Sequence, residues 1–243
     1  IDGHNYKLSQ AWVYPNDNLI LGNYDYVLAH EVGHSLGVYH ANSLECGEDI
    51  SYGHCTHDEY GNPFDVMGNG TKSYNFNAFY KKIFGWINQN STLVIDHSGR
   101  FTLNPLEDGL GNGKKLGLIK LSDSSIPFSL EYRNSLGSNS GLFINKLDIA
   151  KPEGYKGTRL LDMTPSSNNS GFLGRDDFFD SSLKSTFRDN GLNVTIGPIV
   201  NKDSEGITFD VNIEQPSCVH NEPIVTIAVR NNIKSGATGY LGF

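Results

Sequence analysis

Residues 30 to 40 read His-Glu-Val-Gly-His-Ser-Leu-Gly-Val-Tyr-His. His30 and His34 are four residues apart, so on a helix they lie one turn apart on the same face, and both imidazoles can reach one ion. Gly37 is expected to end that helix, because glycine enters the left-handed backbone conformation at little cost. The chain then turns back and brings His40 to the same ion. The stretch therefore predicts a short helix that ends in a metal site.

The residue types at these positions predict a catalytic metal. Three neutral imidazoles, from His30, His34 and His40, predict a Zn²⁺ site whose fourth position is open, which is typical of catalytic rather than structural zinc. Glu31 follows the first ligand and is expected to act as a general base on water without binding the ion. The alternative is an amphipathic helix with surface histidines, and it must explain Glu31, Gly37 and His40 as coincidences.

The pattern H-E-x-x-H-x-x-G-x-x-H resembles the metzincin clan of zinc endopeptidases. Metzincins carry a methionine turn beneath the metal, and the resemblance assigns that role to Met67 in Phe-Asp-Val-Met-Gly (64–68), although Met67 could also be an ordinary core residue. Asp65 is a candidate hydrogen-bond partner for a ligand histidine, or else a cap of the turn. Some metzincins have a tyrosine two residues after this methionine; here Asn69 stands there, and Tyr74 is a substitute only in principle.

The resemblance extends along most of the chain. The stretch Glu-Tyr-Gly-Asn-Pro-Phe-Asp-Val-Met-Gly (59–68) is similar to the sequence before the methionine turn in gametolysin-like peptidases and their bacterial relatives. This likeness implies a secreted zinc endopeptidase that hydrolyses peptide bonds of extracellular or structural proteins. Weaker matches follow at residues 84–87, 130–133, 160–165, 186–189 and 216–219.

The predicted fold class is α+β. Residues 1–90 are expected to be the C-terminal portion of a metzincin-like catalytic domain, with the zinc helix, the methionine turn and a second helix near residues 75–87. Such domains place a sheet before the zinc helix, and with only 29 residues ahead of His30 that sheet is expected to be largely missing here.

After residue 90 the apolar pattern changes to a period of two, typical of strands. Residues 91–215 are therefore expected to form an antiparallel, β-rich, sandwich-like subdomain. Residues 216–243 are expected to be a linker and the start of an incomplete β module. Candidate strands lie at 93–95, 100–103, 116–121, 128–132, 142–147, 192–196 and 207–213.

Composition narrows the range of partners. The net charge is −8 and no basic patch is apparent, which argues against nucleic-acid binding. No apolar run approaches the ~20 residues that cross a bilayer, so no membrane span is expected. Protein or peptide substrates are the expected partners.

The cysteine pattern predicts one disulfide. Cys46 and Cys55 enclose a short polar segment, which favours a bridge and an oxidising, extracellular setting. Two free thiols are the alternative, as is a second metal site with His54 and His57, although that spacing matches no common zinc ligand set. Cys218 has no assigned partner.

Two further hypotheses concern function. The chain could be a zinc-bearing adhesion module that binds carbohydrate or protein with little or no catalysis, or a zinc hydrolase acting on another substrate; Glu31 argues against a catalytically dead scaffold. Calcium could bind at Arg-Asp-Asp (175–177), but solvated loop charge is the better explanation of these residues.

Overall fold

Strands dominate the part of the chain that the structure describes. The computed structural model describes residues 24–46, 55–68, 75–109, 113–122, 126–136, 140–148, 157–163 and 186–214. Within these ranges there are two helices, α1 (Tyr24–Ser35) and α2 (Ala78–Ile83). The strands are β1 (Ala41–Glu45), β2 (Thr56–Asp58), β3 (Thr92–Ile95), β4 (Gly99–Leu103), β5 (Leu116–Ile119), β6 (Phe128–Arg133), β7 (Gly141–Asp148), β8 (Gly157–Leu161), β9 (Phe187–Asp189), β10 (Val194–Lys202) and β11 (Ile207–Ile213).

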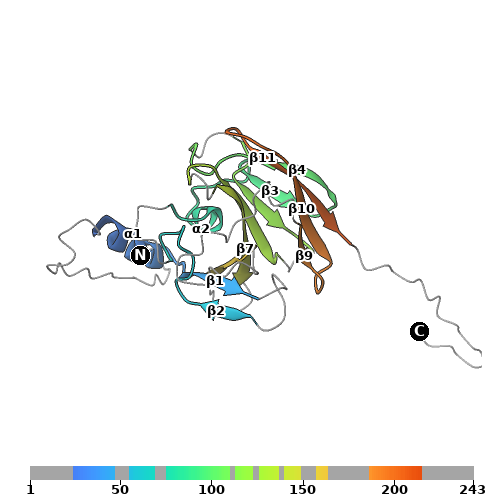
Figure 1. Cartoon of the computed structure of the whole chain (residues 1–243). Coiled ribbons are helices and arrows are strands. Elements are labelled where there is room, and N and C mark those ends of the chain that lie inside the picture. Colours follow the sequence, from blue (N-terminus) through green and yellow to red (C-terminus); the bar gives the residue numbers. More distant parts are fainter. Residues whose placement is uncertain are drawn as a thin grey trace, which may run out of the picture.

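The strands form two sheets. The larger sheet has seven strands in the order β2-β1-β8-β7-β6-β5-β3, and the smaller has four in the order β4-β11-β10-β9. The larger sheet is mixed, because β1 pairs in parallel with β8 and β3 with β5. The smaller sheet is antiparallel throughout. Figure 1 shows β4, β9, β10 and β11 as one layer beside the larger sheet, with both helices on the other side.

The main hydrophobic core lies between the two sheets. Phe128 of β6 meets Phe187 of β9 edge to face, with ring centroids 5.2 Å apart. Burying a side chain of this size contributes roughly 1.5–3 kcal/mol, so contacts of this kind hold the layers together. Both sheets supply this core, which includes Leu44, Ile95, Leu103, Ile119, Leu130, Leu142, Ile144, Leu161, Val194, Ile196, Ile207 and Phe209.

Strand β6 is buried along its whole length and separates two environments. Because successive side chains of a strand point to opposite faces, Phe128, Leu130 and Tyr132 enter the core between the sheets. Glu131 and Arg133 lie on the other face, where Glu131 Oε2 accepts a hydrogen bond from the Ala78 amide of α2 at 2.5 Å. The polar face of this central strand therefore supports the layer that contains the histidines.

The α+β prediction is wrong for the described structure. The fold is β-rich: α1 has 12 residues and α2 only 6, against eleven strands. The second helix is shorter than the predicted 75–87, because the Asn77 side chain caps it at the Tyr80 amide and Gly85 follows with φ of 77°. The β-rich part is also not purely antiparallel, since the larger sheet contains two parallel pairs.

Strands from both sides of residue 90 share the larger sheet. β1 lies directly after His40, and its residues Ala41–Leu44 pair with Thr158–Leu161 of β8. The predicted boundary between 1–90 and 91–215 therefore runs through one hydrogen-bonded sheet. The histidine-bearing segment is anchored in the same framework as the rest of the described chain.

The surface adds two observations. Neither described helix is long and apolar enough to cross a membrane.

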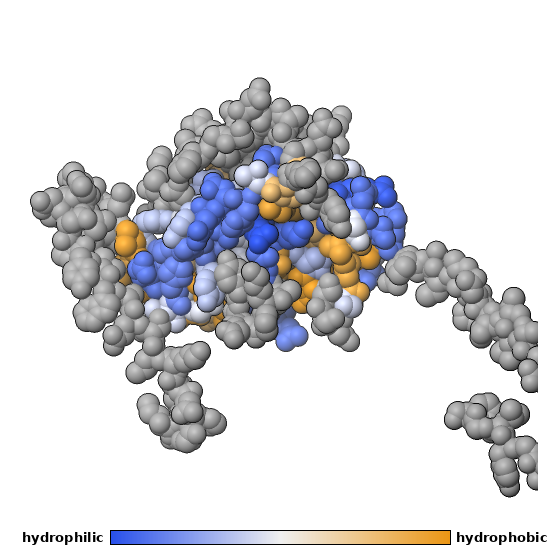
Figure 2. Space-filling view, turned by 90° about the horizontal axis from the view of Figure 1, so that it is seen from below, coloured by the Kyte–Doolittle hydropathy of each residue, from blue (hydrophilic) through white to orange (hydrophobic). Residues whose placement is uncertain are grey.

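The face shown in Figure 2 is largely hydrophilic where the structure describes it, with hydrophobic side chains in separate patches.

Candidate metal centre

Helix α1 ends in a glycine turn that directs the chain toward His40. The Gly37 amide donates to the His34 carbonyl at 3.0 Å, and the Val38 amide donates to the Gly33 carbonyl at 3.2 Å. These two bonds form the Schellman pattern, in which one left-handed residue follows the helix. Gly37 is that residue, with φ of 90°, a conformation that side chains with a Cβ rarely adopt. The predicted role of Gly37 in ending the helix is confirmed.

The structure brings the three predicted ligands together. His30, His34 and His40 each offer one ligand atom, and these atoms lie within 4.8 Å of one another. The ring centroids are 4.8 Å apart for His30 and His34, 5.4 Å for His30 and His40, and 4.9 Å for His34 and His40. Within the described ranges no other set of His, Cys, Asp or Glu side chains is grouped in this way. The three-histidine cluster predicted from the motif is confirmed.

Hydrogen bonds at Nδ1 select the ligating nitrogen of each ring. His30 Nδ1 lies 2.9 Å from the Val66 carbonyl, and His34 Nδ1 lies 3.0 Å from the Val38 carbonyl. A carbonyl oxygen can only accept, so Nδ1 carries the proton in both rings and Nε2 keeps its lone pair. His40 Nδ1 lies 2.7 Å from Glu59 Oε1, which fixes the same tautomer because a carboxylate also accepts. Three Nε2 lone pairs are thus available at one place.

This donor set fits zinc. Zinc accepts neutral imidazole nitrogen, and its histidine ligands usually donate their other N–H to a carbonyl or a carboxylate. His30 is 8% exposed, and burial lowers its pKa, although the bond to Val66 acts in the other direction. Burial therefore favours the neutral form that binds metal.

Met67 lies directly beneath α1. Its side chain is completely buried, and a Cβ added to Gly33 would stand 2.3 Å from Met67 Sδ. The Ala41 amide donates to the Met67 carbonyl at 2.9 Å, which joins this turn to the strand after His40. The Tyr26 hydroxyl donates to the Gly68 carbonyl, and burial raises the pKa of Tyr26 to about 12, so the phenol keeps its proton. Helix α1 is therefore fastened to the turn at several points.

Asp65 makes the contacts of a turn cap. Its Oδ1 accepts from the Met67 amide at 2.7 Å, and its Oδ2 accepts from the Asn77 amide at 2.6 Å. The side chain has no exposed surface, and burial raises the pKa of Asp65 to about 7, while the two amide bonds act in the opposite direction. Of the two roles that the sequence left open, these contacts match the capping role. Asp65 holds the methionine segment against the start of α2.

A buried ionic network connects the larger sheet to this turn. Arg133 is 2% exposed and donates from Nε to Glu107 at 2.7 Å and from Nη1 to Glu131 at 3.1 Å. Its Nη2 donates to the Phe64 carbonyl at 3.2 Å. Removing one partner of such a pair leaves an uncompensated buried charge, which is strongly destabilising. The position of the Phe64–Met67 segment therefore depends on side chains of β6.

Tyr80 connects the third histidine to β8. Its hydroxyl donates to the His40 carbonyl at 3.0 Å and accepts from the Thr158 amide at 3.1 Å. Tyr80 has no exposed surface, so water cannot replace these bonds. The backbone at His40 is thus set by residues distant in sequence.

Two residues beside the cluster were missed by sequence reasoning. Glu59 holds His40 Nδ1, and the ring of Tyr60 lies 3.8 Å from the His40 ring, measured between centroids. Tyr60 has a left-handed backbone φ of 65°. Burial raises the pKa of Tyr60 most, and the negative charges of Glu59 and Glu31 raise it further. Glu59 and Tyr60 both lie in the stretch 59–68, whose resemblance to peptidases is described above. The useful signal was the predicted disulfide, because a hairpin closed there turns this stretch back toward His40.

The predicted disulfide is confirmed. Cys46 and Cys55 are bonded, with Cα atoms 3.9 Å apart. They extend the antiparallel pairing of β1 with β2, whose last pair is Glu45 with Thr56. With both thiols in the bridge and His57 exposed, the second metal site considered for this segment receives no support among the described residues.

Several predicted features lie outside the described residues. They include the alternative tyrosine and its neighbour (Tyr74, Asn69), the calcium hypothesis at 175–177, Cys218, His54 and the module at 216–243.

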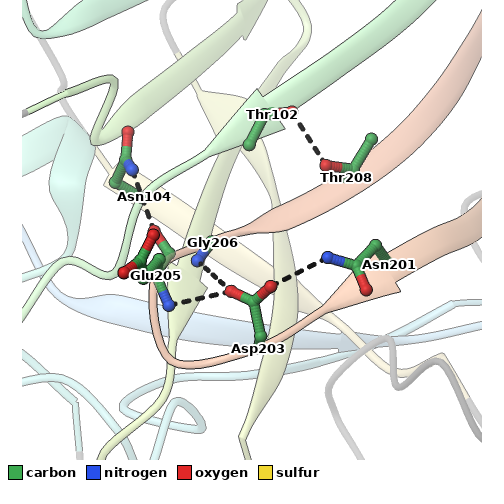
Figure 3. A pocket seen from close by; sticks show the side chains of 7 residues that line it. All are labelled: Thr102, Asn104, Asn201, Asp203, Glu205, Gly206 and Thr208. Atoms are coloured by element: carbon green, nitrogen blue, oxygen red, sulfur yellow. Dashed lines mark hydrogen bonds between the residues drawn. The ribbon is translucent and has the colours of Figure 1, made fainter.

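A polar pocket lies at the turn between β10 and β11, far from the histidines in sequence. Figure 3 shows that its polar groups point toward one another. Asp203 accepts from the Asn201 side chain at 2.9 Å and from the amides of Glu205 and Gly206 at 2.9 and 3.0 Å. The carboxylate at the centre of this pocket therefore serves to hold the β10–β11 turn together.

Comparison with protein-family models, with curated proteins and with solved structures finds no match to this chain. The function is therefore inferred from the chemistry of the site itself.

Proposed function

We propose that this chain is a zinc-dependent endopeptidase in which His30, His34 and His40 bind the metal and Glu31 is the general base. The observation that carries the proposal is the convergence of three imidazoles whose Nδ1 atoms are all engaged elsewhere. This arrangement leaves three Nε2 atoms for one ion. Zinc bound at such a site would supply Lewis-acid chemistry, which polarises a carbonyl and makes water nucleophilic near neutral pH.

The chain's own residues supply the proton transfers. Glu31 directly follows His30 on α1, and the negative charge of its carboxylate acts to raise the pKa of both His30 and Tyr60. That carboxylate takes the proton from the attacking water and returns it to the leaving amine. Met67 packs against Gly33 of α1, between His30 and His34, and this contact keeps the two helical histidines in register with His40.

The ligand count favours catalysis over a structural metal. A structural zinc site is usually closed by four protein ligands. Among the described residues no fourth Cys, His, Asp or Glu joins the three histidines. An acidic residue next to a ligand is also useful for proton transfer and unnecessary for a purely structural ion.

Peptide bonds are the proposed target because the motif and the stretch 59–68 resemble zinc endopeptidases. The resemblance bears on the site and not on the β-rich architecture. The Cys46–Cys55 disulfide is compatible with an extracellular location, since such bonds persist in oxidising compartments. We therefore propose a secreted enzyme acting on extracellular or structural protein.

The alternative, a zinc-bearing adhesion module, gains no specific support. The polar pocket at the β10–β11 turn is the feature closest to a carbohydrate site. Its central carboxylate, Asp203, is already engaged by three donors of its own turn. It therefore offers little to a sugar hydroxyl.

The test is a peptide-library cleavage profile of the full chain, zinc-loaded and chelator-treated. Cleavage should require zinc and return when zinc is restored. Glu31→Gln should bind zinc normally and lose about 10²–10⁴-fold in turnover, the usual contribution of a general base. Asp25→Asn, also on α1 and exposed, is the matched control and should cleave normally. A Glu31→Gln variant that cleaves at the wild-type rate would contradict the proposal.

A further inference from the structure

The three histidines are held by different kinds of partner. His30 and His34 bond to the backbone carbonyls of Val66 and Val38. His40 alone among them bonds to a side chain, with Nδ1 2.7 Å from Glu59 Oε1. We propose that Glu59 is the positioning residue of the metal centre, which orients His40 and strengthens it as a ligand. This inference deepens the proposed function and rests on its metal site.

The β1–β2 hairpin brings Glu59 to His40. β1 begins one residue after His40, and β2 ends one residue before Glu59. The two strands are antiparallel, with Ser43 opposite Asp58. Glu59 is consequently carried to the end of the hairpin where His40 stands, while the disulfide closes the other end. The pair is thus a result of strand register.

The turn after Glu59 is packed against β1 in a way that fixes its position. The Tyr60 amide donates to Asn42 Oδ1 at 3.1 Å. A Cβ added to Gly61 would stand 2.1 Å from Ser43 Oγ, so only glycine fits beside that strand. Tyr60 adopts the left-handed φ of 65°, a cost that surrounding contacts must offset. Its ring then packs on the His40 ring at 3.8 Å.

The exposure of the pair shows where its effect lies. The Glu59 side chain is 63% exposed and that of His40 is 18% exposed. A pair so open to water adds little to folding stability. Its geometric effect on a ligand is different, because loss of a carboxylate partner of a metal-bound histidine typically lowers metal affinity about 10–100-fold. Glu59 should therefore matter for the metal much more than for the fold.

The experiment measures zinc affinity of the full chain by competition with a chromophoric chelator. Glu59→Ala should weaken zinc binding about 10–100-fold. Glu59→Gln should recover part of this loss, because its amide oxygen still accepts from Nδ1. Asp58→Asn removes a neighbouring charge that does not contact His40, and it should bind zinc like wild type. Thermal unfolding of the metal-free proteins should be similar for all four chains.

Cobalt substitution gives a second readout that a structural role would not change. The visible absorption of the cobalt form should shift in Glu59→Ala and much less in Asp58→Asn. Wild-type zinc affinity and an unchanged cobalt spectrum in Glu59→Ala would overturn the inference while leaving the proposed function intact. A wild-type chain that binds no zinc would overturn both.

Discussion

Met67 occupies the space that a side chain on Gly33 would need. A Cβ at Gly33 would stand 2.3 Å from Met67 Sδ and 3.0 Å from Phe76 Cε1. Gly33 lies between the helical ligands His30 and His34. Its contact with Met67 therefore sets the distance between α1 and the turn that contains Met67. The glycine within the histidine motif is thus explained by packing against a residue 34 positions later.

Gly33→Ala should therefore destabilise the protein by about 1–3 kcal/mol through overpacking and should weaken zinc binding. Urea unfolding and zinc titration measure the two effects. In a Met67→Ala background the same substitution should cost much less, because the sulfur is gone. Additive costs in this double-mutant cycle would show that the two residues do not interact.

Removing Arg133 should be among the most damaging single changes. Arg133→Met leaves Glu107 and Glu131 without the guanidinium that they bind and removes its hydrogen bond to the Phe64 carbonyl. We expect a loss of about 3–5 kcal/mol in the free energy of unfolding. The matched control is Arg100→Met, which breaks the exposed pair with Asp210 and should be nearly neutral. Equal losses in the two variants would refute the role given to the buried network.

We expect the free energy of unfolding to rise at alkaline pH because of Lys81. Burial lowers the pKa of Lys81 to about 8 from its usual 10.5. The folded protein disfavours the ammonium form of Lys81. Above pH 10.5 the amine is neutral in both the folded and the unfolded chain, so this group does not destabilise the fold. As the pH falls from 10.5 to about 8, stability is lost, because the unfolded chain takes up a proton that the buried amine does not. The free energy of unfolding should thus gain on the order of 3 kcal/mol from this group between these pH values.

Denaturant titrations at pH 8, 9 and 10 of wild type and Lys81→Met test this effect. The contributions of all other titrating groups to the pH dependence cancel in the difference between the two proteins. The stability difference between the two should change across this range. Lys82→Met, at the next position but only partly buried, should track wild type. A constant difference between wild type and Lys81→Met would contradict the prediction.

The Cys46–Cys55 bridge should stabilise the hairpin without holding the metal. In the chain-entropy model, closing a loop of this length contributes roughly 2–3 kcal/mol. The double variant Cys46→Ala/Cys55→Ala should melt at a lower temperature. It should still bind one zinc per chain, because no ligand in the described cluster is a cysteine. Loss of stoichiometric zinc in this variant would contradict that assignment.

Local features were predictable from the sequence and long-range ones were not. The spacing of His30, His34 and His40 and the chemistry of Gly37 determine the end of α1, and both act within a few residues. The apolar alternation likewise indicated the strands that became β3, β4, β5, β6, β7, β10 and β11. Such patterns report the burial of one face, which neighbouring residues encode directly.

The errors concern pairing between distant segments. β1 reads Ala-Asn-Ser-Leu-Glu, which carries no strand alternation, and it is a strand because it pairs with β8. The α+β prediction failed in part because it did not include β1 and β2 in the larger sheet. Glu59 was missed because its relation to His40 follows from hairpin register, 19 residues along the chain, and not from motif spacing.

The parallel pairing of β1 with β8 also governs when the metal centre can form. Ala41 pairs with Thr158, and Tyr80 links the His40 carbonyl to the same residue. Such non-local contacts form slowly, because the intervening chain must first be closed into a loop. During synthesis, we therefore expect His40 to take its final position beside His30 and His34 only after β8 has left the ribosome. A chain shortened before Gly157 would carry every ligand and still lack the strand that positions the third.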